Sequence, residues 1–203
     1  NTPGAADWTA GAISDDGQTM VMTQDQEIHV SYNGGSSWTK QLDESQSDFK
    51  LVKCSSDCSI IIALDHGQEE IWYSHDKGRH WATVDIPDYD NEFKQLSMSS
   101  DGKQIAFTMS SSYARFSFDY GVTWVRYQVA SGDGSANGVH VSPDGTRILA
   151  QLDSIYIHSA GPLPCAQNEK VVSYACVACG AGTSNDAGDD PTGADTNCDP
   201  ILC

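Results

Sequence analysis

The clearest local pattern in this chain is a series of short stretches in which apolar residues alternate with polar ones or form brief continuous runs. Alternation with a period of two is typical of half-buried β-strands, and a short apolar run between turn residues is typical of a fully buried strand. No helical period accompanies these stretches. The pattern predicts strands over residues 8–13, 19–23, 27–32 and 38–42; 49–54, 59–64, 70–74 and 80–86; 93–98, 104–109, 113–118 and 123–129; and 138–141, 147–152 and 154–158.

An octapeptide separates the third and fourth strands of the first three groups and recurs with a step of 43 residues. We call its copies, residues 31–38, 74–81 and 117–124, the outer turns. An Asp or Asn side chain can bond to turn N–H groups, Gly permits a positive φ, and Trp can begin the next strand while covering the turn. The recurring residues are Ser31, Asn33, Gly35 and Trp38; Ser74, Asp76, Gly78 and Trp81; and Ser117, Asp119, Gly121 and Trp124.

A second repeat, Ser-x-Asp-Gly, lies between the first and second strands of every group, with Cys in place of Gly in the second copy. We call its four copies, residues 14–17, 55–58, 99–102 and 142–145, the inner turns. Their steps are 41, 44 and 43 residues. A fixed period of this size is typical of a repeat architecture. The inner turns therefore predict four units of about four strands, although only three units have an outer turn.

The outer turns resemble the Asp-box, or BNR, repeat of sialidase-like and sortilin-like β-propellers, and three copies in register make the resemblance specific. It implies that the twelve outer-turn residues are structural, because the family uses this motif as a turn at the rim of a blade. We therefore expect an all-β fold: a four-bladed β-propeller over residues 1–160, followed by a small disulfide-rich tail over residues 161–203. The runs at 60–64 and 105–107 are expected to be buried between neighbouring blades.

The fourth unit is predicted to be incomplete. Its third strand is followed by Ser159, Ala160 and Gly161 and then by two prolines, so that no fourth outer turn or outer strand is expected. Residues 1–6 or a strand from another protomer can fill such an edge, or it can remain short and solvated. An open solenoid or stack of sheets would satisfy the same repeats as a propeller.

Charge and cysteine content restrict the setting of the protein. With 11 basic and 28 acidic residues the net charge is −17, which argues against nucleic acid and anionic membranes as partners. No run of 18 apolar residues is present to span a membrane. The chain begins at Asn1 without a signal-like segment, as expected of a processed or trimmed chain. Seven cysteines indicate an oxidising compartment, so we expect a secreted, cell-surface location.

Two cysteines lie in the repeats and five in the tail. Cys54 and Cys58 flank residues 55–57 of the second inner turn, where a disulfide would staple the hairpin. No other Cys or His cluster completes a zinc site with them. In the tail, the residues before Cys203 echo those before Cys165. This echo suggests that Cys203 is the first cysteine of another copy of the tail.

The tail resembles short cysteine-rich modules of algal and protist surface proteins, loosely akin to ephrin-receptor-like and TNF-receptor-like repeats. Residues 176–183 and 187–198 carry the resemblance, which implies a rigid spacer. The simplest internal pairing is Cys54–Cys58, Cys165–Cys176 and Cys179–Cys198, although spacing leaves the connectivity open. Cys203 would then pair with a following module or another chain, or remain free.

No constellation of side chains indicates catalysis. The four arginines lack the motif that accompanies sialidase chemistry, and the loop carboxylates are typical of any acidic protein. The histidines have no metal-binding spacing. The residues considered are Arg79, Arg115, Arg126 and Arg147; Asp65, Glu69, Glu70 and the run 85–92; and His66, His75, His80 and His140.

Two weaker ligand hypotheses remain. Oxygen ligands for calcium are available in the tail at Asp186, Asp189, Asp190 and Asp195, without a recognised calcium-loop pattern. Aromatic side chains that could stack on sugars, or pack between blades, are Trp72, Tyr73, Tyr89, Tyr120 and Tyr127.

We therefore expect a non-enzymatic extracellular structural protein, without a cofactor unless calcium binds. It would be a protomer of a cell-surface filament, hair or coat, joined head to tail to copies of itself or to a following cysteine-rich module. The incomplete blade, the odd cysteine and the connector-like tail motivate this expectation. The alternatives are a lectin-like propeller that binds surface glycans and, third, a glycoside hydrolase-like enzyme, which needs two carboxylates about 5–10 Å apart.

Overall fold

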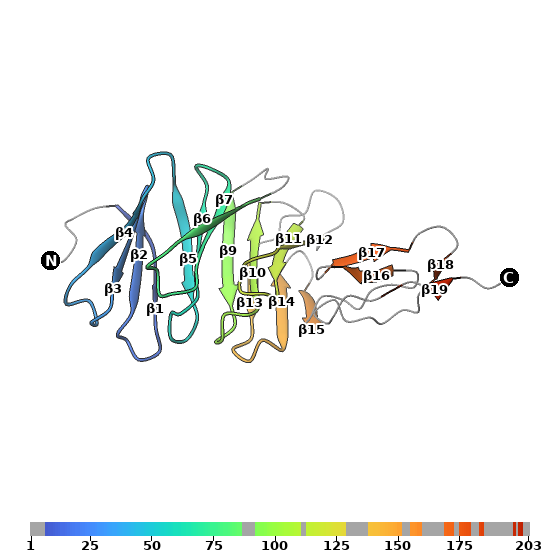
Figure 1. The fold of residues 1–203 in the computed structure, drawn as a ribbon. Helices are drawn as coiled ribbons and strands as arrows, with labels where there is room; N and C mark the ends of the chain where they lie inside the picture. Colours follow the sequence, from blue (N-terminus) through green and yellow to red (C-terminus); the bar gives the residue numbers. More distant parts are fainter. Residues whose placement is uncertain are drawn as a thin grey trace. The chain divides into compact units, whose positions relative to one another are not determined.

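A computed structural model describes residues 7–86, 92–110, 113–128, 138–151, 155–159, 169–172, 175–179, 183–184, 197 and 199–200 (Figure 1). Its contacts divide the chain into two units, residues 1–158 and 159–203. The regular structure of the described residues is entirely β, and within these residues no helix is long and apolar enough to cross a membrane.

The first unit contains four antiparallel sheets, or blades, each formed by consecutive strands. Blade 1 consists of β1 (Trp8–Ile13), β2 (Met20–Gln24), β3 (Glu27–Ser31) and β4 (Thr39–Asp43). Blade 2 consists of β5 (Phe49–Cys54), β6 (Ile61–Asp65), β7 (Glu70–Ser74) and β8 (Ala82–Asp85). Blade 3 consists of β9 (Phe93–Met98), β10 (Ile105–Met109), β11 (Tyr113–Ser117) and β12 (Val125–Gln128). Blade 4 consists of β13 (Gly138–Val141), β14 (Arg147–Gln151) and β15 (Ile155–Ser159).

These sheets confirm the predicted all-β, four-bladed fold, and the fourth sheet has three strands among the described residues. The outer-turn tryptophans are an exception to the predicted strand limits, because each fourth strand begins one residue after its Trp. The indole N–H of Trp38 donates to the carbonyl of Gly35 at 3.1 Å, and Trp81 and Trp124 make the same bond. The tryptophans therefore belong to the turns and do not begin the strands.

Successive blades lie side by side in sequence order (Figure 1). The first strands β1, β5, β9 and β13 pack against one another in that order. A layer of buried apolar side chains fills each of the three spaces between neighbouring blades. Because β6 and β10 have a blade on each side, all five residues of each are buried, as predicted for the apolar runs.

Blade 1 differs from blades 2 and 3 because, among the described residues, it has a neighbouring blade on one side only. Val21 and Thr23 of β2 are buried toward blade 2, whereas the alternate residues Met20, Met22 and Gln24 are partly exposed. Among the described strands, β13 does not pack on β1 as the other first strands pack on one another. The described blades therefore form an open series.

The second unit contains two small antiparallel pairs. Strand β16 (Glu169–Val172) pairs with β17 (Ala175–Ala178), and β18 (Thr183–Ser184) pairs with β19 (Asp199–Pro200). Cys179 is disulfide-bonded. The other tail cysteines lie outside the residues whose side chains are described, so the pairs Cys165–Cys176 and Cys179–Cys198 and the role of Cys203 stay predictions. Residues 1–6 and the calcium candidates Asp186, Asp189, Asp190 and Asp195 also lie outside the described residues.

Candidate functional site

Each outer turn holds itself together through its recurring residues. In blade 2 the Ser74 hydroxyl donates to Asp76 Oδ1 and accepts the Gly78 N–H, both at 2.9 Å. The same Asp76 oxygen accepts the N–H of His80 at 2.9 Å. Blades 1 and 3 repeat this arrangement around Asn33 and Asp119. The polar groups of the motif are thus used within the turn, which is a structural role.

Hydrogen bonding lowers the pKa of two turn carboxylates, Asp76 and Asp144. Burial alone would raise the pKa of Asp76, but bonds from the His80 backbone and ring and from Ser74 outweigh it and lower the pKa to about 2. In the fourth inner turn, bonds from the Ser142 hydroxyl and from the backbone and hydroxyl of Thr146 lower the pKa of Asp144 to about 2. These carboxylates are ionised acceptors at neutral pH and do not resemble general acids.

The inner turns require a left-handed residue at their fourth position. Gly17, Gly102 and Gly145 have φ of 70, 76 and 70°, and Cys58 takes the same place with φ of 53°. A disulfide joins Cys58 to Cys54, so this pair closes the second inner turn. It is a covalent staple in a turn that lacks glycine.

The inner turns also link the blades through backbone hydrogen bonds between their second residues. The Asp15 N–H donates to the Ser56 carbonyl at 2.7 Å, the Ser56 N–H to the Ser100 carbonyl at 2.7 Å, and the Ser100 N–H to the Pro143 carbonyl at 2.8 Å. We call this series the turn ladder. Every donor belongs to the N-terminal blade of its pair, so the ladder has a direction. It ends at Pro143, which has no N–H.

A second kind of link joins the outer turns in the same direction. The Tyr32 hydroxyl of blade 1 donates to the Lys77 carbonyl of blade 2 at 3.0 Å. At the next interface, His75 Nε2 lies 3.0 Å from the Tyr120 carbonyl, and because a carbonyl only accepts, the ring donates. The equivalent residue of blade 3 is Phe118, which has no donor and precedes the blade without an outer turn.

The partly exposed side of blade 1 is the feature that most resembles an interaction surface. We call it the blade 1 face and define it by Trp8, Ile13, Met20, Met22 and His29. Register places Ile13 opposite Met20 and His29 opposite Met22, and the rings of Trp8 and His29 meet edge to face at 5.3 Å. Ile13 is 57% exposed, the largest fraction among the large hydrophobic residues that the structure describes.

Repeat equivalence shows what this face lacks. Counting from the inner turns, Met20 and Met22 correspond to Ile61 and Ala63 in blade 2 and to Ile105 and Phe107 in blade 3. Those four residues are all 0% exposed, because the preceding blade covers them. The blade 1 face is therefore the same kind of surface without its cover.

A charged group borders the blade 1 face. Glu27 accepts from His29 at 2.7 Å and from Lys40 at 2.9 Å. These hydrogen bonds, from His29 first and then Lys40, outweigh burial and lower the pKa of Glu27. The edge of the face therefore carries paired charges, while its centre is apolar.

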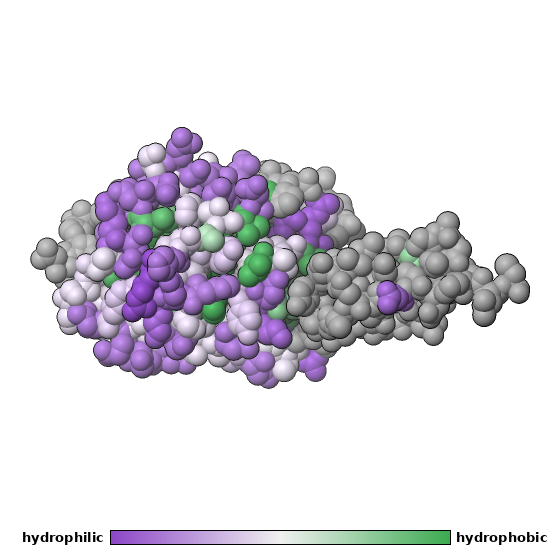
Figure 2. All heavy atoms as spheres, viewed as in Figure 1, coloured by the Kyte–Doolittle hydropathy of each residue, from purple (hydrophilic) through white to green (hydrophobic). Residues whose placement is uncertain are grey.

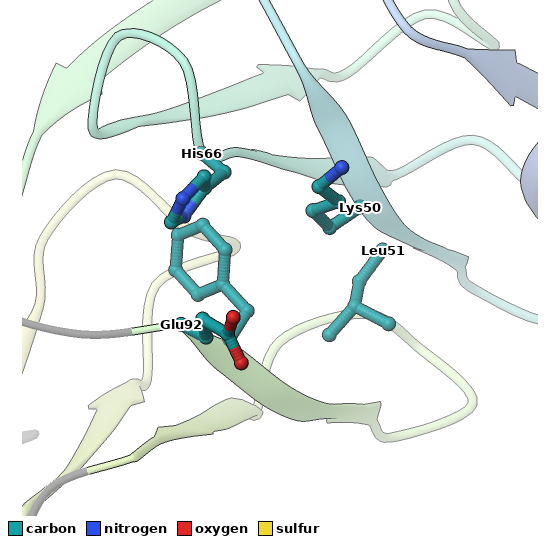
Figure 3. Close-up of a pocket in the computed structure, with 5 residues that line it drawn as sticks. Lys50, Leu51, His66 and Glu92 are labelled. Atoms are coloured by element: carbon teal, nitrogen blue, oxygen red, sulfur yellow. The ribbon is translucent and has the colours of Figure 1, made fainter.

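Two hollows lie elsewhere on the blades. A cavity of about 290 Å³ is lined by Lys50, Leu51, His66, Glu92 and Phe93. Figure 3 shows Lys50 and Leu51 on β5 across from His66 and Glu92. Glu92 is the one carboxylate among the described residues that line this cavity, whereas glycoside hydrolysis ordinarily uses two.

The second hollow is shallow, about 240 Å³, and lies beside the outer turn of blade 2. Tyr73, His75 and Trp81 line it together with Asp76 and His80. The Tyr73 and His75 rings are 5.3 Å apart, and the Tyr120 ring is 6.3 Å from His75. Of the proposed sugar-stacking residues, Trp72 instead packs toward blade 1, and the side chains of Tyr89 and Tyr127 lie outside the described set.

The other candidate side chains are not brought into one site. The four arginines come from three blades: Arg79 in blade 2, Arg115 and Arg126 as cross-strand neighbours in blade 3, and Arg147 in blade 4. Buried Asp65 accepts the N–H groups of Asp48 and Gly67 at 2.7 and 2.8 Å and so holds the β6–β7 loop. In the described part of the chain no three His, Cys, Asp or Glu side chains converge as a metal site.

Reasoning from the sequence alone missed the blade 1 face. The signal was present, because methionines stand at positions 20 and 22 where the next two units have Ile, Ala and Phe. Figure 2 shows that the surface in that view is mainly hydrophilic, with only small hydrophobic spots among the coloured residues. Among the described residues the exposed large hydrophobic side chains are Ile13, Tyr120 and Val122, and Ile13 belongs to the blade 1 face.

Comparison with solved structures shows the fold. A chain in the crystal structure of the mitotic checkpoint complex matches 75% of this chain and 46% of its own length, with 12% identity and a TM-score of 0.58. An ancestral GH74 enzyme matches 75% of this chain and 27% of its own, with 14% identity and a TM-score of 0.56. YCF48 bound to a D1 peptide matches 94% of this chain and 67% of its own, with 14% identity and a TM-score of 0.56.

These similar structures are β-propellers and include both an enzyme and non-enzymes. The chain spans less than half the length of the first two. No family model matches the sequence, and no curated protein matches it.

Proposed function

We propose that this protein is a non-enzymatic, extracellular assembly module whose repeats are Asp-box blades and whose tail is a cysteine-rich spacer. The observation that carries the proposal is that the described blades form an open series. Among the described residues no blade covers the blade 1 face, and β15 is the last of three strands in its sheet. Apolar surface of this kind is typical of a protein contact. A cell-surface filament, hair or coat would use such contacts to join protomers.

The chemistry of the repeats supports a structural role. The Asp and Ser side chains of the turns are engaged in short local hydrogen bonds, and the conspicuous histidine His75 links two blades. The net charge of −17 and the Cys54–Cys58 disulfide suit a hydrated extracellular setting. The YCF48 structure, in which a propeller of similar fold holds a peptide, provides a precedent for protein contact.

Imaging of native material by electron microscopy, with light scattering of the purified chain, tests this proposal. We expect multimers whose formation is reduced by Met22→Lys, because a charge on the blade 1 face opposes burial. Val122→Lys is the matched control, since Val122 is another exposed apolar residue, 43% accessible, but lies in the outer turn of blade 3. Monomers throughout, in native material as well as in solution, would overturn the proposal.

The shallow hollow beside the blade 2 outer turn favours one alternative, a lectin-like function. Tyr73, His75 and Trp81 present rings next to Asp76, a combination of aromatic and acidic groups that suits stacking and hydrogen bonding to a sugar. A glycan array would support this alternative through a saturable signal that Trp81→Ala removes and Trp8→Ala leaves unchanged. A glycan array without a saturable signal would rule out the lectin-like function.

A further inference from the structure

We propose that the blade 1 face is the docking site for one further blade of the same repeat type, one that offers two hydrogen-bond donors which this chain's own fourth blade lacks. The inference deepens the proposed function by naming the partner. It rests on three features of blade 1: its apolar face and two backbone carbonyls.

The first carbonyl continues the turn ladder. In each of the three described interfaces, the second inner-turn residue of one blade donates its N–H to the corresponding carbonyl of the next blade. Asp15 stands at that position in blade 1, and among the described residues no donor reaches its carbonyl. A covering blade would supply an N–H there, provided that its second inner-turn residue is not proline.

The second carbonyl continues the links between outer turns. Gly34 is the repeat equivalent of Lys77 and Tyr120, and all three have φ of 63–64°. The carbonyls of Lys77 and Tyr120 accept from Tyr32 and His75 of the preceding blade, whereas that of Gly34 has no such donor in the described part of the chain. A covering blade would place Tyr or His directly after the Ser of its outer turn.

The apolar part of the blade 1 face indicates which side chains a covering blade would place against it. At the interface of blades 1 and 2, Val21, Ile28 and Val30 on one sheet meet Ile61 and Ala63 on the other. On the blade 1 face, Met20 and Met22 take the places of Ile61 and Ala63, and Met22 lies across Gly11, where an added Cβ would come within 2.8 Å of its sulfur. Methionine adapts its shape to a partner. Branched aliphatic residues on the covering blade would fit this surface.

Blade 4 of a second copy does not meet this description. Its second inner-turn residue is Pro143, which cannot donate, and its sequence has no outer turn to supply Tyr or His. Blade 2 does meet it, with Ser56 and His75 as donors and with Ile62 and Leu64 on the side that faces the next blade. A duplicate of blade 2 is therefore a suitable probe for the site.

The test uses the full chain extended at its N-terminus by a second copy of residues 44–86. Oxidation of Met22 by dilute hydrogen peroxide is followed by mass spectrometry, with buried Met109 as the internal reference. If the added blade docks, Met22 should oxidise at least about tenfold more slowly than in the unextended chain, which corresponds to a docking constant of about ten.

The matched control carries Ser56→Pro and His75→Phe in the added copy only. The chain itself shows that both residues fit these positions, as Pro143 and Phe118. We expect most of the protection to be lost. Equal protection by both extensions would overturn the specified partner, because apolar cover alone would then suffice.

The remaining outcomes are also decisive. An extension that leaves Met22 unprotected, whether or not it folds, contradicts the inference, because the added blade would not have docked on the blade 1 face. Concentration-dependent protection of Met22 in the unextended chain that equals the protection given by the added blade, with dimers in sedimentation equilibrium, would assign the face to a second copy instead. Monomeric native material together with a protective extension would refute the proposed assembly function while leaving this inference intact.

Discussion

The backbone N–H of Ser100 donates to the carbonyl of Pro143 at 2.8 Å, and this bond is the last step of the turn ladder. Pro143 accepts this hydrogen bond but cannot donate a further one, because its ring nitrogen carries no hydrogen. At the other end, Asp15 donates to Ser56, and no donor among the described residues reaches its own carbonyl. The two ends of the turn ladder are therefore chemically different, because one lacks a donor and the other has an acceptor that no described donor reaches.

The contrast between Met22 and Ala63 tests whether the blade 1 face is uncovered in the isolated chain. Met22→Lys should change the free energy of unfolding little, because lysine can extend its charge into water. Ala63→Lys places the charge between two blades and should destabilise by about 3–5 kcal/mol or prevent folding. Urea unfolding of both variants measures the difference, and similar losses would show that Met22 is covered.

Gly121 and Gly35 form a matched pair for the inter-blade contact. Both have a positive φ, 86 and 83°, but a Cβ on Gly121 would come within 2.6 Å of Ile62 in the preceding blade, whereas Gly35 has its nearest atom, Met20 Sδ, at 3.4 Å. Gly35→Ala should cost about 1–2 kcal/mol from backbone conformation alone. Gly121→Ala should cost about 1–3 kcal/mol more through overpacking. Equal losses in denaturant unfolding would refute the packing argument.

Tyr32 should contribute to stability through its hydroxyl. Tyr32→Phe keeps the ring, over which the Arg79 guanidinium lies at 4.7 Å, but removes the bond to the Lys77 carbonyl. The free energy of unfolding should fall by about 0.5–1.5 kcal/mol. Tyr113→Phe is the control, because that ring contacts Arg126 of its own blade. A comparable loss in both variants would argue against the inter-blade link.

The lowered pKa of Asp76 predicts that the free energy of unfolding decreases in acid. Its pKa in the folded chain is about 2 against an ordinary value of 3.8, so the unfolded chain binds the proton first as the pH falls. Its contribution is complete above about pH 4 and is lost progressively toward pH 2. Asp76→Asn keeps the Oδ1 acceptor, as Asn33 does in blade 1, and should flatten the pH dependence over this range. Urea midpoints between pH 2 and 5 measure it, and parallel curves would contradict the assignment.

Much of the fold was predictable because the sequence repeats its turn chemistry. The first strands of all four blades match their predicted limits, since an alternating pattern and an inner turn define each. The limits of the fourth strands were less accurate, because the indole bonds of Trp38, Trp81 and Trp124 to glycine carbonyls belong to the turn. Side-chain hydrogen bonds of this kind do not appear in a hydrophobic pattern.

The candidate site was harder to predict for a physical reason. Whether Met20 and Met22 face another blade depends on which blades lie next to one another, and a local pattern contains no such information. The same holds for Pro143, which looks like an ordinary turn proline until the Ser100 bond shows its place in the ladder. The missing fourth outer turn was visible in the sequence, whereas the uncovered first face was not.

The turn ladder also bears on how the module would respond to mechanical tension. Consecutive blades are joined there by one backbone hydrogen bond per step, and the ladder runs across the blades rather than along the strands. Under a pull on the two chain ends, the blades should therefore separate singly. Each event would release about 43 residues, or roughly 150 Å of extended chain. Such a series of equal extensions would let a fibre absorb sudden load without breaking a covalent bond.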